Sequence, residues 1–474
     1  MQGLTPKGKQ EEVLALPATG HIVVLGTAGS GKTTIAVLRA EHLANMPTAG
    51  KVLLVTFNGA LAEYMRKISS TISCNLVVEN YHKFAKGYLN SRGMMPYNCI
   101  LKDNDVKTEY IAEALETLKR VYPEEPTLKR SLEFFVDEIS FMQKFGYTDK
   151  NDYLVAERIG RASANVKREK RPFIFLVYEK YLELRKNNGY LYDWDDIAMY
   201  TYQELCNDTS ERRYSHIIVD EGQDFSPMMI KSLVKAVGQN GSFSFFGDVA
   251  QQIYGSRLSW RDSAIQTNKI WRFDVNYRNP ASISDFAKDI MQSRYWQKSN
   301  DIIEASSYIA EGPQPVLIHF SCEQNELNWI IKQAMQISKN SSAVIICRNR
   351  SDIHMINEMI SKAGGETVII DKNTAGFANV KKLYLSTYHA AKGLEFDNVF
   401  IPYLSSERFP NLETLCDSRT DDEIYADELK LLYVAATRSK YGLYMTYSGE
   451  LSVLFPAETK HCKCIEEEEL NVRL

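Results

Sequence analysis

The sequence has little excess charge of either sign, no long apolar run and no apolar leader. Lysine and arginine total 56 against 60 aspartate and glutamate residues, a net charge of -4. Composition therefore gives no basic footprint for nucleic acid. The longest apolar runs, such as Phe173 to Tyr178, are far too short to cross a bilayer. Because Met1 to Lys7 lacks the apolar core of a secretory signal, we expect a cytoplasmic protein with no membrane partner.

Cysteine is also sparse, with eight residues scattered along the 474 of the chain. This distribution favours free thiols in a reducing compartment. One short cluster, His461-Cys462-Lys463-Cys464, has the residue types of a metal site but lacks a second pair. We interpret it as part of a solvated C-terminal tail over residues 451–474. The length predicts about three domains, and the composition, 44% hydrophobic and 24% charged, is ordinary for a folded globular chain.

A glycine-rich turn, Gly26-Thr27-Ala28-Gly29-Ser30-Gly31-Lys32-Thr33, lies near the start of the chain. It follows a predicted strand, His21 to Leu25, and precedes a predicted helix, Thr34 to Leu43, which is the context of the phosphate-binding pattern G-x-x-x-x-G-K-[ST]. Backbone N–H groups and the helix N-terminus would surround phosphate oxygens, and Lys32 would reach the β and γ phosphates. Thr33 would hold Mg²⁺. The alternative is a chance glycine-rich turn, which the flanking elements disfavour.

An apolar strand from Ser215 to Val219 runs directly into Asp220-Glu221-Gly222-Gln223-Asp224. Adjacent acids at the end of a strand suit a magnesium nucleotide site, with Asp220 at the metal and Glu221 polarising the attacking water. Acidic residues are also common turn formers after a strand, but that interpretation loses weight beside a P-loop. Together the two motifs predict ATP and Mg²⁺ as cofactors.

Strands alternate with helices in two stretches of the chain. Lys51 to Phe57 and Leu76 to Glu79 are predicted as further buried parallel strands of the first unit. Amphipathic helices replace this alternation from about Ser91 to Tyr190, and it returns with the strand from Ser215 to Val219. A second series of strands and helices follows from about Pro315 to Tyr447. We therefore predict an α/β fold with two motor-like units and parallel sheets. The expected division is 1–90 and 191–275 for the first unit, 91–190 for a helical insertion, 276–450 for the second unit and 451–474 for the tail.

Several single residues are candidates for binding. Gln10 could read adenine through its amide, although alone it is only a surface glutamine. The strand ends Thr56-Phe57-Asn58 and Asn80-Tyr81-His82 could stack on bases and hold phosphates, or their aromatic rings could belong to the core. Arg278 and Arg438 could stabilise charge on a γ-phosphate, or form an ordinary interdomain ion pair. The basic run Lys167 to Arg171, with Arg161 upstream, could contact phosphates or form a solvated helix face.

In their order these motifs resemble the superfamily 1 helicases of the UvrD, Rep and PcrA group, over Leu4 to about Tyr447. The resemblance implies two RecA-like domains with ATP in the cleft between them and single-stranded DNA across the top. It implies nucleotide contacts from Gln10, Gly26, Thr27, Ala28, Gly29, Ser30, Gly31, Lys32, Thr33, Thr34, Tyr277 and Glu395. Catalytic roles fall on Lys32, Asp220, Glu221, Gln251, Arg278 and Arg438, and the metal on Thr33 and Asp220. DNA contacts fall on Thr56, Phe57, Asn58, His82, Tyr254, Trp260, Thr387 and His389.

The resemblance also implies a direction of movement and shows three departures. The form Ala391-Lys392-Gly393-Leu394-Glu395-Phe396 is that of the branch that moves 3′ to 5′ on single-stranded DNA. Only residues 371–381 stand where relatives carry a large accessory subdomain. Ser256 replaces a base-stacking tryptophan, for which Trp260 could substitute, and Leu429-Lys430 stands where arginines are common.

The leading hypothesis is an ATP-dependent 3′ to 5′ translocase or helicase that acts on single-stranded or tailed DNA, in DNA repair or antiphage defence. The alternative is an ATP-loaded DNA-sensing subunit that regulates a partner nuclease without robust unwinding of its own. From the short stretch after Lys440 we expect no fused nuclease domain. A P-loop kinase or signalling GTPase is disfavoured because neither needs a second α/β unit with its own arginine motif.

Overall fold

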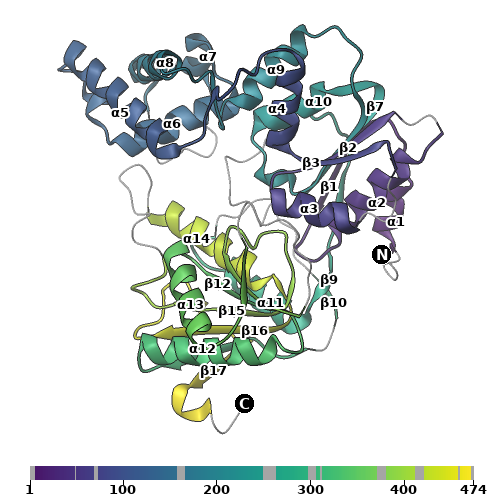
Figure 1. Cartoon of the computed structure of the whole chain (residues 1–474), viewed down its shortest axis with the longest axis vertical. Helices are drawn as coiled ribbons and strands as arrows, with labels where there is room; N and C mark the ends of the chain where they lie inside the picture. The colour runs from purple at the N-terminus through teal and green to yellow at the C-terminus, as the bar shows by residue number, and fades with distance from the viewer. Residues whose placement is uncertain are drawn as a thin grey trace.

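The computed structural model describes residues 6–47, 50–68, 73–156, 166–248, 263–296, 306–309, 312–370, 381–410, 421–456 and 459–470. It shows two α/β lobes, with a group of helices beside the first lobe (Figure 1). The predicted fold, two RecA-like domains with parallel sheets and a helical insertion in the first, is confirmed.

The first lobe is built on one parallel sheet. Its strands are β1 (Gly20–Gly26), β2 (Lys51–Thr56), β3 (Leu76–Asn80), β6 (Tyr214–Val219), β7 (Val237–Gly247) and β8 (Ile270–Phe273). They form a six-stranded sheet in the order β3-β2-β6-β7-β1-β8. The helices are α1 (Lys9–Leu14), α2 (Lys32–Ala44), α3 (Gly59–Ile68), α4 (Tyr81–Ser91), α9 (Ile197–Asn207) and α10 (Pro227–Lys235). Two separate apolar clusters pack on the sheet, which is why its inner strands are apolar throughout.

The helical insertion has its own apolar core. Its elements are β4 (Ile100–Leu101), α5 (Asn104–Val121), α6 (Leu132–Phe145), α7 (Lys150–Val155), α8 (Arg171–Asn187) and β5 (Tyr192–Asp193). Phe135, Tyr153 and Tyr181 are buried in that core. The basic run expected at Lys167 to Arg171 is partly structural, because the guanidinium of Arg171 donates to the carbonyls of Tyr153, Leu154 and Ala156. Arg161 lies outside the described residues.

A buried polar network joins the insertion to the first lobe. Arg185 from α8 donates to Asp193 Oδ2 at 2.9 Å and also contacts Asp196, which stands at the start of α9. Lys107 from α5 donates to Asp195 Oδ2 at 2.8 Å. Since these charges are removed from water, their mutual pairing is what makes the burial tolerable. The acidic segment Tyr192 to Asp196 therefore anchors the insertion.

The second lobe carries a larger parallel sheet. Its strands are β11 (Val316–Phe320), β12 (Ala343–Cys347), β13 (Thr367–Ile370), β14 (Leu383–Thr387), β15 (Phe396–Ile401), β16 (Ser439–Ser448) and β17 (Lys463–Glu466). The seven strands follow the order β13-β14-β12-β15-β16-β11-β17. The helices are α11 (Ala281–Met291), α12 (Glu323–Ile337), α13 (Arg350–Lys362) and α14 (Asp421–Ala436), and a two-stranded pair, β9 (Val275–Pro280) with β10 (Ser306–Ile309), lies beside them.

Three structural findings bear on expectations from the sequence. The interpretation of 451–474 as a solvated tail is wrong for its middle, because β17 pairs with β11 as the last strand of the sheet and Cys462 is buried. Among the described residues, no group of three or more His, Cys, Asp or Glu could hold a metal ion. Strands β13 and β14 are parallel neighbours in the sheet, and β14 begins at Leu383, 13 residues after the last residue of β13, Ile370.

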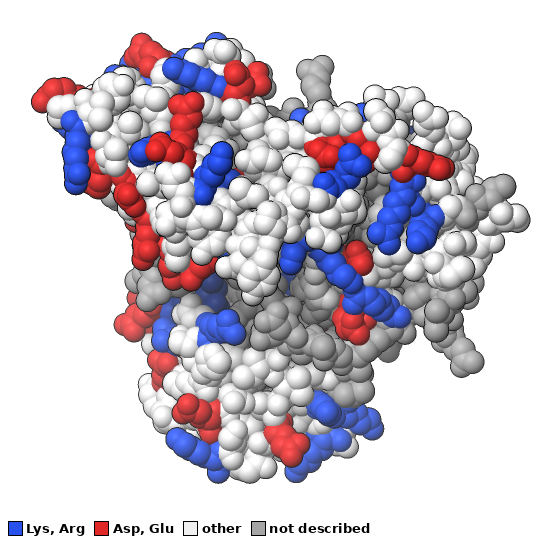
Figure 2. All heavy atoms as spheres, turned by 45° about the horizontal axis from the view of Figure 1, so that its top comes forward, with Lys and Arg blue, Asp and Glu red and all other residues white. Residues whose placement is uncertain are grey.

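Charges of both signs are interspersed over the described residues of the face in Figure 2. No helix in the described parts of the chain has the length and apolar character that a bilayer span requires.

Candidate nucleotide site between the two lobes

The glycine-rich turn between β1 and α2 has the backbone geometry that a phosphate cradle needs. Gly29 and Gly31 have φ angles of 72° and 81°, in the left-handed region that glycine adopts without strain. Gly31 precedes the first residue of α2, so the helix N-terminus points at the turn. Gln10 lies against the same turn, and its side-chain amide donates to Ser30 O at 2.9 Å. The local sequence thus positions all of these groups together.

Lys32 points back into the turn. Its ammonium donates to Gly26 O at 2.9 Å and Thr27 O at 2.6 Å, and it lies 3.5 Å from the carboxylate of Asp248 at the end of β7. The side chain is buried. The Lys32 ammonium therefore places a positive charge inside the turn, where it can bind an anion.

The acids at the end of β6 face the same turn. Thr33 Oγ1 donates to Asp220 Oδ2 at 2.7 Å, which places the two predicted metal ligands side by side. Burial and the neighbouring Glu221 raise the pKa of Asp220. Burial also acts on Glu221, but Lys392, Lys32 and Arg438 outweigh it and lower the pKa of that carboxyl. The lowered pKa keeps Glu221 ionised near neutral pH, as a group that polarises water must be.

Glu221 has an unusual backbone conformation, with φ 53° and ψ 40°. Its carboxylate accepts a hydrogen bond from the Gln223 amide, and Gln223 Oε1 accepts one from Asp248 N at 2.8 Å. The sequence of the motif therefore builds a closed turn that fixes the Glu221 carboxylate. Strain of this kind at a polar cleft is frequent at functional sites.

Residues of β9 reach the turn from beyond the first sheet. Tyr277 N donates to Gly29 O at 2.9 Å. A Cβ atom on Gly29 would lie 2.1 Å from Asn276 Oδ1 and 2.7 Å from Arg278 Cβ, so only glycine permits this close approach. The predicted nucleotide-binding residues Tyr277 and Arg278 thus adjoin the P-loop backbone.

Arg278 and Arg438 are close enough to each other for the charge of Arg278 to act on Arg438. Arg278 pairs with Glu395, which also accepts from Lys440 Nζ at 3.1 Å. Although burial raises it, these two cations lower the pKa of Glu395 to about 2. Arg438 is buried and donates to Val434 O at 2.8 Å. Burial and the neighbouring charge of Arg278 lower its pKa to about 10, while Glu221 acts in the opposite direction.

A further contact joins the lobes directly. Lys392, from the turn after β14, donates to Asp224 at the end of the acidic motif, and both side chains are buried. In the same turn Gly393 approaches α3, where a Cβ atom would lie 3.0 Å from the side chain of Leu61. Sequence reasoning gave neither Lys392 nor Asp224 a role of its own.

The residues present fit a magnesium-bound nucleoside triphosphate. Three buried oxygen atoms that face the turn have no hydrogen-bond partner among the described residues: Thr27 Oγ1, Ser30 Oγ and Asp220 Oδ1. An oxygen of a carboxylate beside a threonine hydroxyl is the ligand type that Mg²⁺ takes. The backbone N–H groups of the turn supply the phosphate ligands. The oxygen ligands, the loop N–H groups and the positive charge of Lys32 therefore suit the ATP and Mg²⁺ that the sequence predicts.

The candidate DNA residues of the first lobe fall into two groups. Tyr81 is buried, and its hydroxyl forms a hydrogen bond with the hydroxyl of Ser232, so Tyr81 belongs to the core. Thr56 is also buried. Phe57 and His82 are half-buried and touch each other edge to face, with ring centroids 5.7 Å apart.

Trp194 extends this aromatic pair, because its ring lies 4.9 Å from that of His82. Trp194 was not among the residues predicted from the sequence to contact DNA. Asn58 is half-buried beside Phe57, and Thr387 and His389 are half-buried in the second lobe. Gln251, Tyr254, Ser256 and Trp260 lie outside the described residues.

The sequence matches two families of domains that together cover most of the chain. Residues 7–272 match the UvrD/REP helicase N-terminal domain, and residues 271–377 and 372–450 match the UvrD-like helicase C-terminal domain. A probable DNA helicase of Mycoplasma pneumoniae is 25% identical over 495 residues, covering 98% of this chain and 88% of that relative.

Two other relatives are larger proteins. DNA helicase II of Escherichia coli is 21% identical over 386 residues, covering 75% of this chain and 50% of the relative. The exonuclease/helicase subunit RexA of Lactococcus lactis is 23% identical over 253 residues, covering 50% of this chain and 20% of the relative. The chain therefore spans half or less of these two proteins.

Proposed function

Because this chain belongs to the UvrD/REP helicase family, whose members are ATP-hydrolysing DNA helicases, we propose that it couples ATP hydrolysis between its two lobes to 3′ to 5′ movement along single-stranded DNA. The observation that best supports this proposal is the meeting of two sets of groups. Lys32, Thr33 and the acids of β6 come from the first lobe. Arg278, Glu395 and Arg438 approach them from the β9 segment and the second lobe.

The proposed roles follow from the charges. The N–H groups of the turn and Lys32 bind the phosphates, and Thr33 and Asp220 hold Mg²⁺, which when bound neutralises developing charge on the phosphate oxygens. Glu221 is ionised and can orient and polarise a water molecule. Arg278 and Arg438 contribute planar cations to the γ-phosphate. Gln251 belongs to this set by its motif alone.

Movement along DNA would follow when the two lobes close on the nucleotide and open again. Groups of both lobes must meet for hydrolysis. ATP binding therefore favours the closed arrangement of the lobes, and product release allows the lobes to open. Phe57, His82 and Trp194 form a half-exposed aromatic cluster suited to stacking on bases. Thr387 and His389 are proposed to hold the DNA backbone from the second lobe. The 3′ to 5′ direction rests on the form of the segment Ala391 to Phe396.

Strand separation with tailed duplexes tests this proposal. The purified chain should unwind a duplex with a 3′ single-stranded tail in the presence of ATP and Mg²⁺, and leave a duplex with a 5′ tail intact. The Lys32→Ala variant should be inactive on both. Unwinding from the 5′ tail alone would contradict the proposed direction.

A second candidate function is an ATP-loaded DNA-sensing subunit that controls a partner nuclease. Two observations favour it: the sequence has only residues 371–381 at the position expected for a large accessory subdomain, and a relative carries the name exonuclease/helicase subunit RexA. On this hypothesis the chain alone hydrolyses ATP on DNA but unwinds poorly, and a co-purifying protein restores unwinding. A repair or defence role would then belong to the complex.

A further inference from the structure

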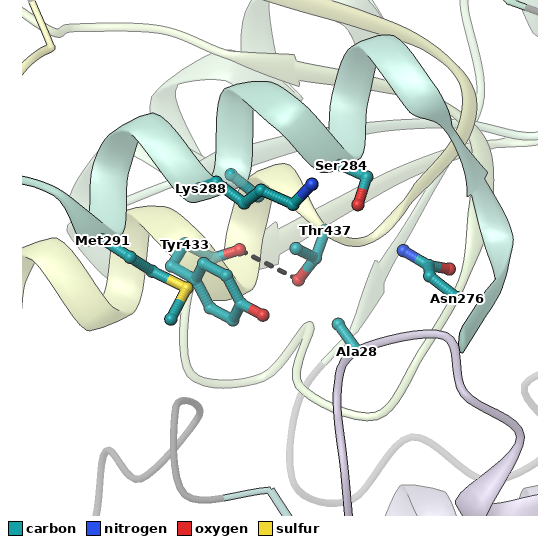
Figure 3. Close-up of a pocket in the computed structure, with 8 residues that line it drawn as sticks. Ala28, Asn276, Ser284, Lys288, Met291, Tyr433 and Thr437 are labelled. Carbon is teal, nitrogen blue, oxygen red and sulfur yellow. Dashed lines mark hydrogen bonds between the residues drawn. The ribbon is translucent and has the colours of Figure 1, made fainter. Parts of the chain in front are cut away.

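The nucleotide site touches the second lobe at the P-loop as well as at the acidic motif. Ala28 is buried in one apolar cluster with Ile283 and Phe286 of α11 and Tyr433 of α14. Figure 3 shows the P-loop carrying Ala28 up to a small pocket whose other residues come from β9, from α11, and from α14 and the residue after it. These contacts join the site to the second lobe. The candidate DNA residues of the first lobe meet the site through a different residue, Phe225.

Phe225 directly follows Asp224, the last acid of the motif at the end of β6. Its backbone N–H donates to Gly222 O at 3.2 Å. One residue earlier, Asp224 N donates to Glu221 O at 3.0 Å. These two bonds close the short turn over Gly222–Asp224, with Glu221 at its start and Phe225 at its end. The position of Phe225 therefore affects the backbone that carries the Glu221 carboxylate.

The ring of Phe225 packs against the candidate DNA residues. It is only 1% exposed and meets the Phe57 ring edge to face, with centroids 6.1 Å apart. Phe57 in turn meets His82, the other half-buried ring of this group. A second support for Phe225 comes from Tyr81, whose ring centroid lies 5.9 Å away and whose hydroxyl forms a 2.7 Å hydrogen bond with Ser232 Oγ. A continuous series of ring contacts thus runs from the half-buried rings to the turn of the acidic motif.

We infer that Phe225 is a positioning residue that couples the binding of single-stranded DNA to the conformation of Glu221. The inference rests on the proposed function, in which bases stack on Phe57 and His82. A base stacked on Phe57 restricts that ring, and the restriction reaches Phe225 because rings in a close-packed core do not shift independently. Bound DNA therefore favours the conformation of the turn in which Glu221 polarises water, and hydrolysis is faster on DNA than without it.

Phe225→Leu tests this, because it keeps a buried apolar side chain and removes the ring that meets Phe57. Phe243→Leu is the matched control. Phe243 is buried in the same apolar cluster, on β7, and its ring meets His21 with centroids 5.9 Å apart. The measurements on the full chain are kcat without DNA, kcat with saturating oligothymidylate, and the affinity for that oligonucleotide without nucleotide.

In Phe225→Leu the ratio of kcat with DNA to kcat without DNA should fall by about fivefold or more, the lower end of the coupling between two sites in a protein. Oligonucleotide affinity should stay within a few-fold of wild type, because the buried ring does not itself stack on a base. Phe243→Leu should keep both the ratio and the affinity. A wild-type ratio in Phe225→Leu, or an equal loss of the ratio in both variants, would overturn the inference.

A further measurement needs no substitution and covers the case in which Phe225→Leu does not fold. Hydrogen–deuterium exchange of the wild-type peptide spanning 217–229 should slow when oligothymidylate is added without nucleotide. Unchanged exchange in a wild type whose ATP hydrolysis is stimulated by DNA contradicts the inference alone. A wild type that DNA does not stimulate contradicts the proposed function, and the inference with it.

Discussion

Lys392 of the second lobe and Asp224 of the first lobe form a buried ion pair that connects the two lobes. Asp224 closes the motif that holds Asp220 and Glu221, and Lys392 lies three residues before Glu395, the partner of Arg278. The charge of Lys392 also lowers the pKa of Glu221. One lysine therefore links the position of the second lobe to the state of the proposed water-polarising carboxylate.

Replacing Lys392 by Met should lower ATP turnover on single-stranded DNA by about tenfold, equivalent to roughly 1.4 kcal/mol of barrier. The substitution leaves the buried carboxylates of Asp224 and Glu221 without the charge of Lys392, which disfavours the closed arrangement of the two lobes. Steady-state kcat is the measurement. Lys362→Met, at the exposed end of α13, is the control and should leave kcat unchanged. Wild-type turnover by Lys392→Met would show that the pair has no part in the cycle.

The Asp224 carboxyl also predicts a pH dependence of stability. Burial raises its pKa to about 7, although Lys392 opposes the shift. A carboxyl whose pKa is higher in the folded state holds its proton there and releases it on unfolding. Its contribution to stability is therefore present at low pH and is lost as the pH rises from about 4 to about 7.

Urea unfolding of wild type and Asp224→Asn between pH 5 and 8 measures this effect. Asparagine does not titrate, so the advantage of wild type over the variant should shrink as the pH rises to 7 and then stay constant. A difference that is independent of pH over this range, or that grows with pH, would contradict the raised pKa of Asp224.

Glu221→Gln should reduce kcat by about 10²-fold to 10⁴-fold, the range expected when a positioned base is lost. Binding of a fluorescent ATP analogue should remain within a few-fold of wild type, because Lys32 and the loop amides are untouched. Glu113→Gln, on the exposed face of α5, serves as the comparison. Substantial hydrolysis by the glutamine variant would mean that another group polarises the water.

Much of the fold and of the nucleotide site could be predicted because the local structure of these motifs is determined by residues within the motifs themselves. Glycines at positive φ, a lysine and a strand-to-helix change define the P-loop without reference to distant residues. The apolar strand before Asp220 fixes its place at the end of a parallel sheet. These features depend on short-range sequence, and the structure agrees with them.

Other features depend on contacts that the chain makes only when folded. Strand β17 has a single buried apolar residue, Ile465, and becomes a strand because the edge of β11 pairs with it. The ring contact of Trp194 with His82 joins residues that are more than 100 positions apart in the sequence. The apolar cluster that contains both Ala28 and Tyr433 joins residues of two lobes. Spacing along the sequence carries no signal for any of them.

The anchor of the insertion predicts a stability effect. Arg185→Met should lower the free energy of unfolding of the insertion by about 3–5 kcal/mol, because it leaves the carboxylates of Asp193 and Asp196 buried without their shared cation. Urea unfolding followed by circular dichroism measures it. Lys119→Met removes an exposed ion pair with Glu116 in the same insertion and should change little. Equal effects of the two substitutions would contradict the anchoring role.

The most direct test of hydrolysis by groups from both lobes is ATP turnover by Arg438→Ala, measured with single-stranded DNA alongside the affinity for a fluorescent ATP analogue. The account predicts a fall in kcat of about 10³-fold or more, as for other arginines that reach a γ-phosphate from a facing domain, with analogue affinity changed only a few-fold. Turnover close to the wild-type rate would contradict it, because the first lobe would then cleave ATP without the second.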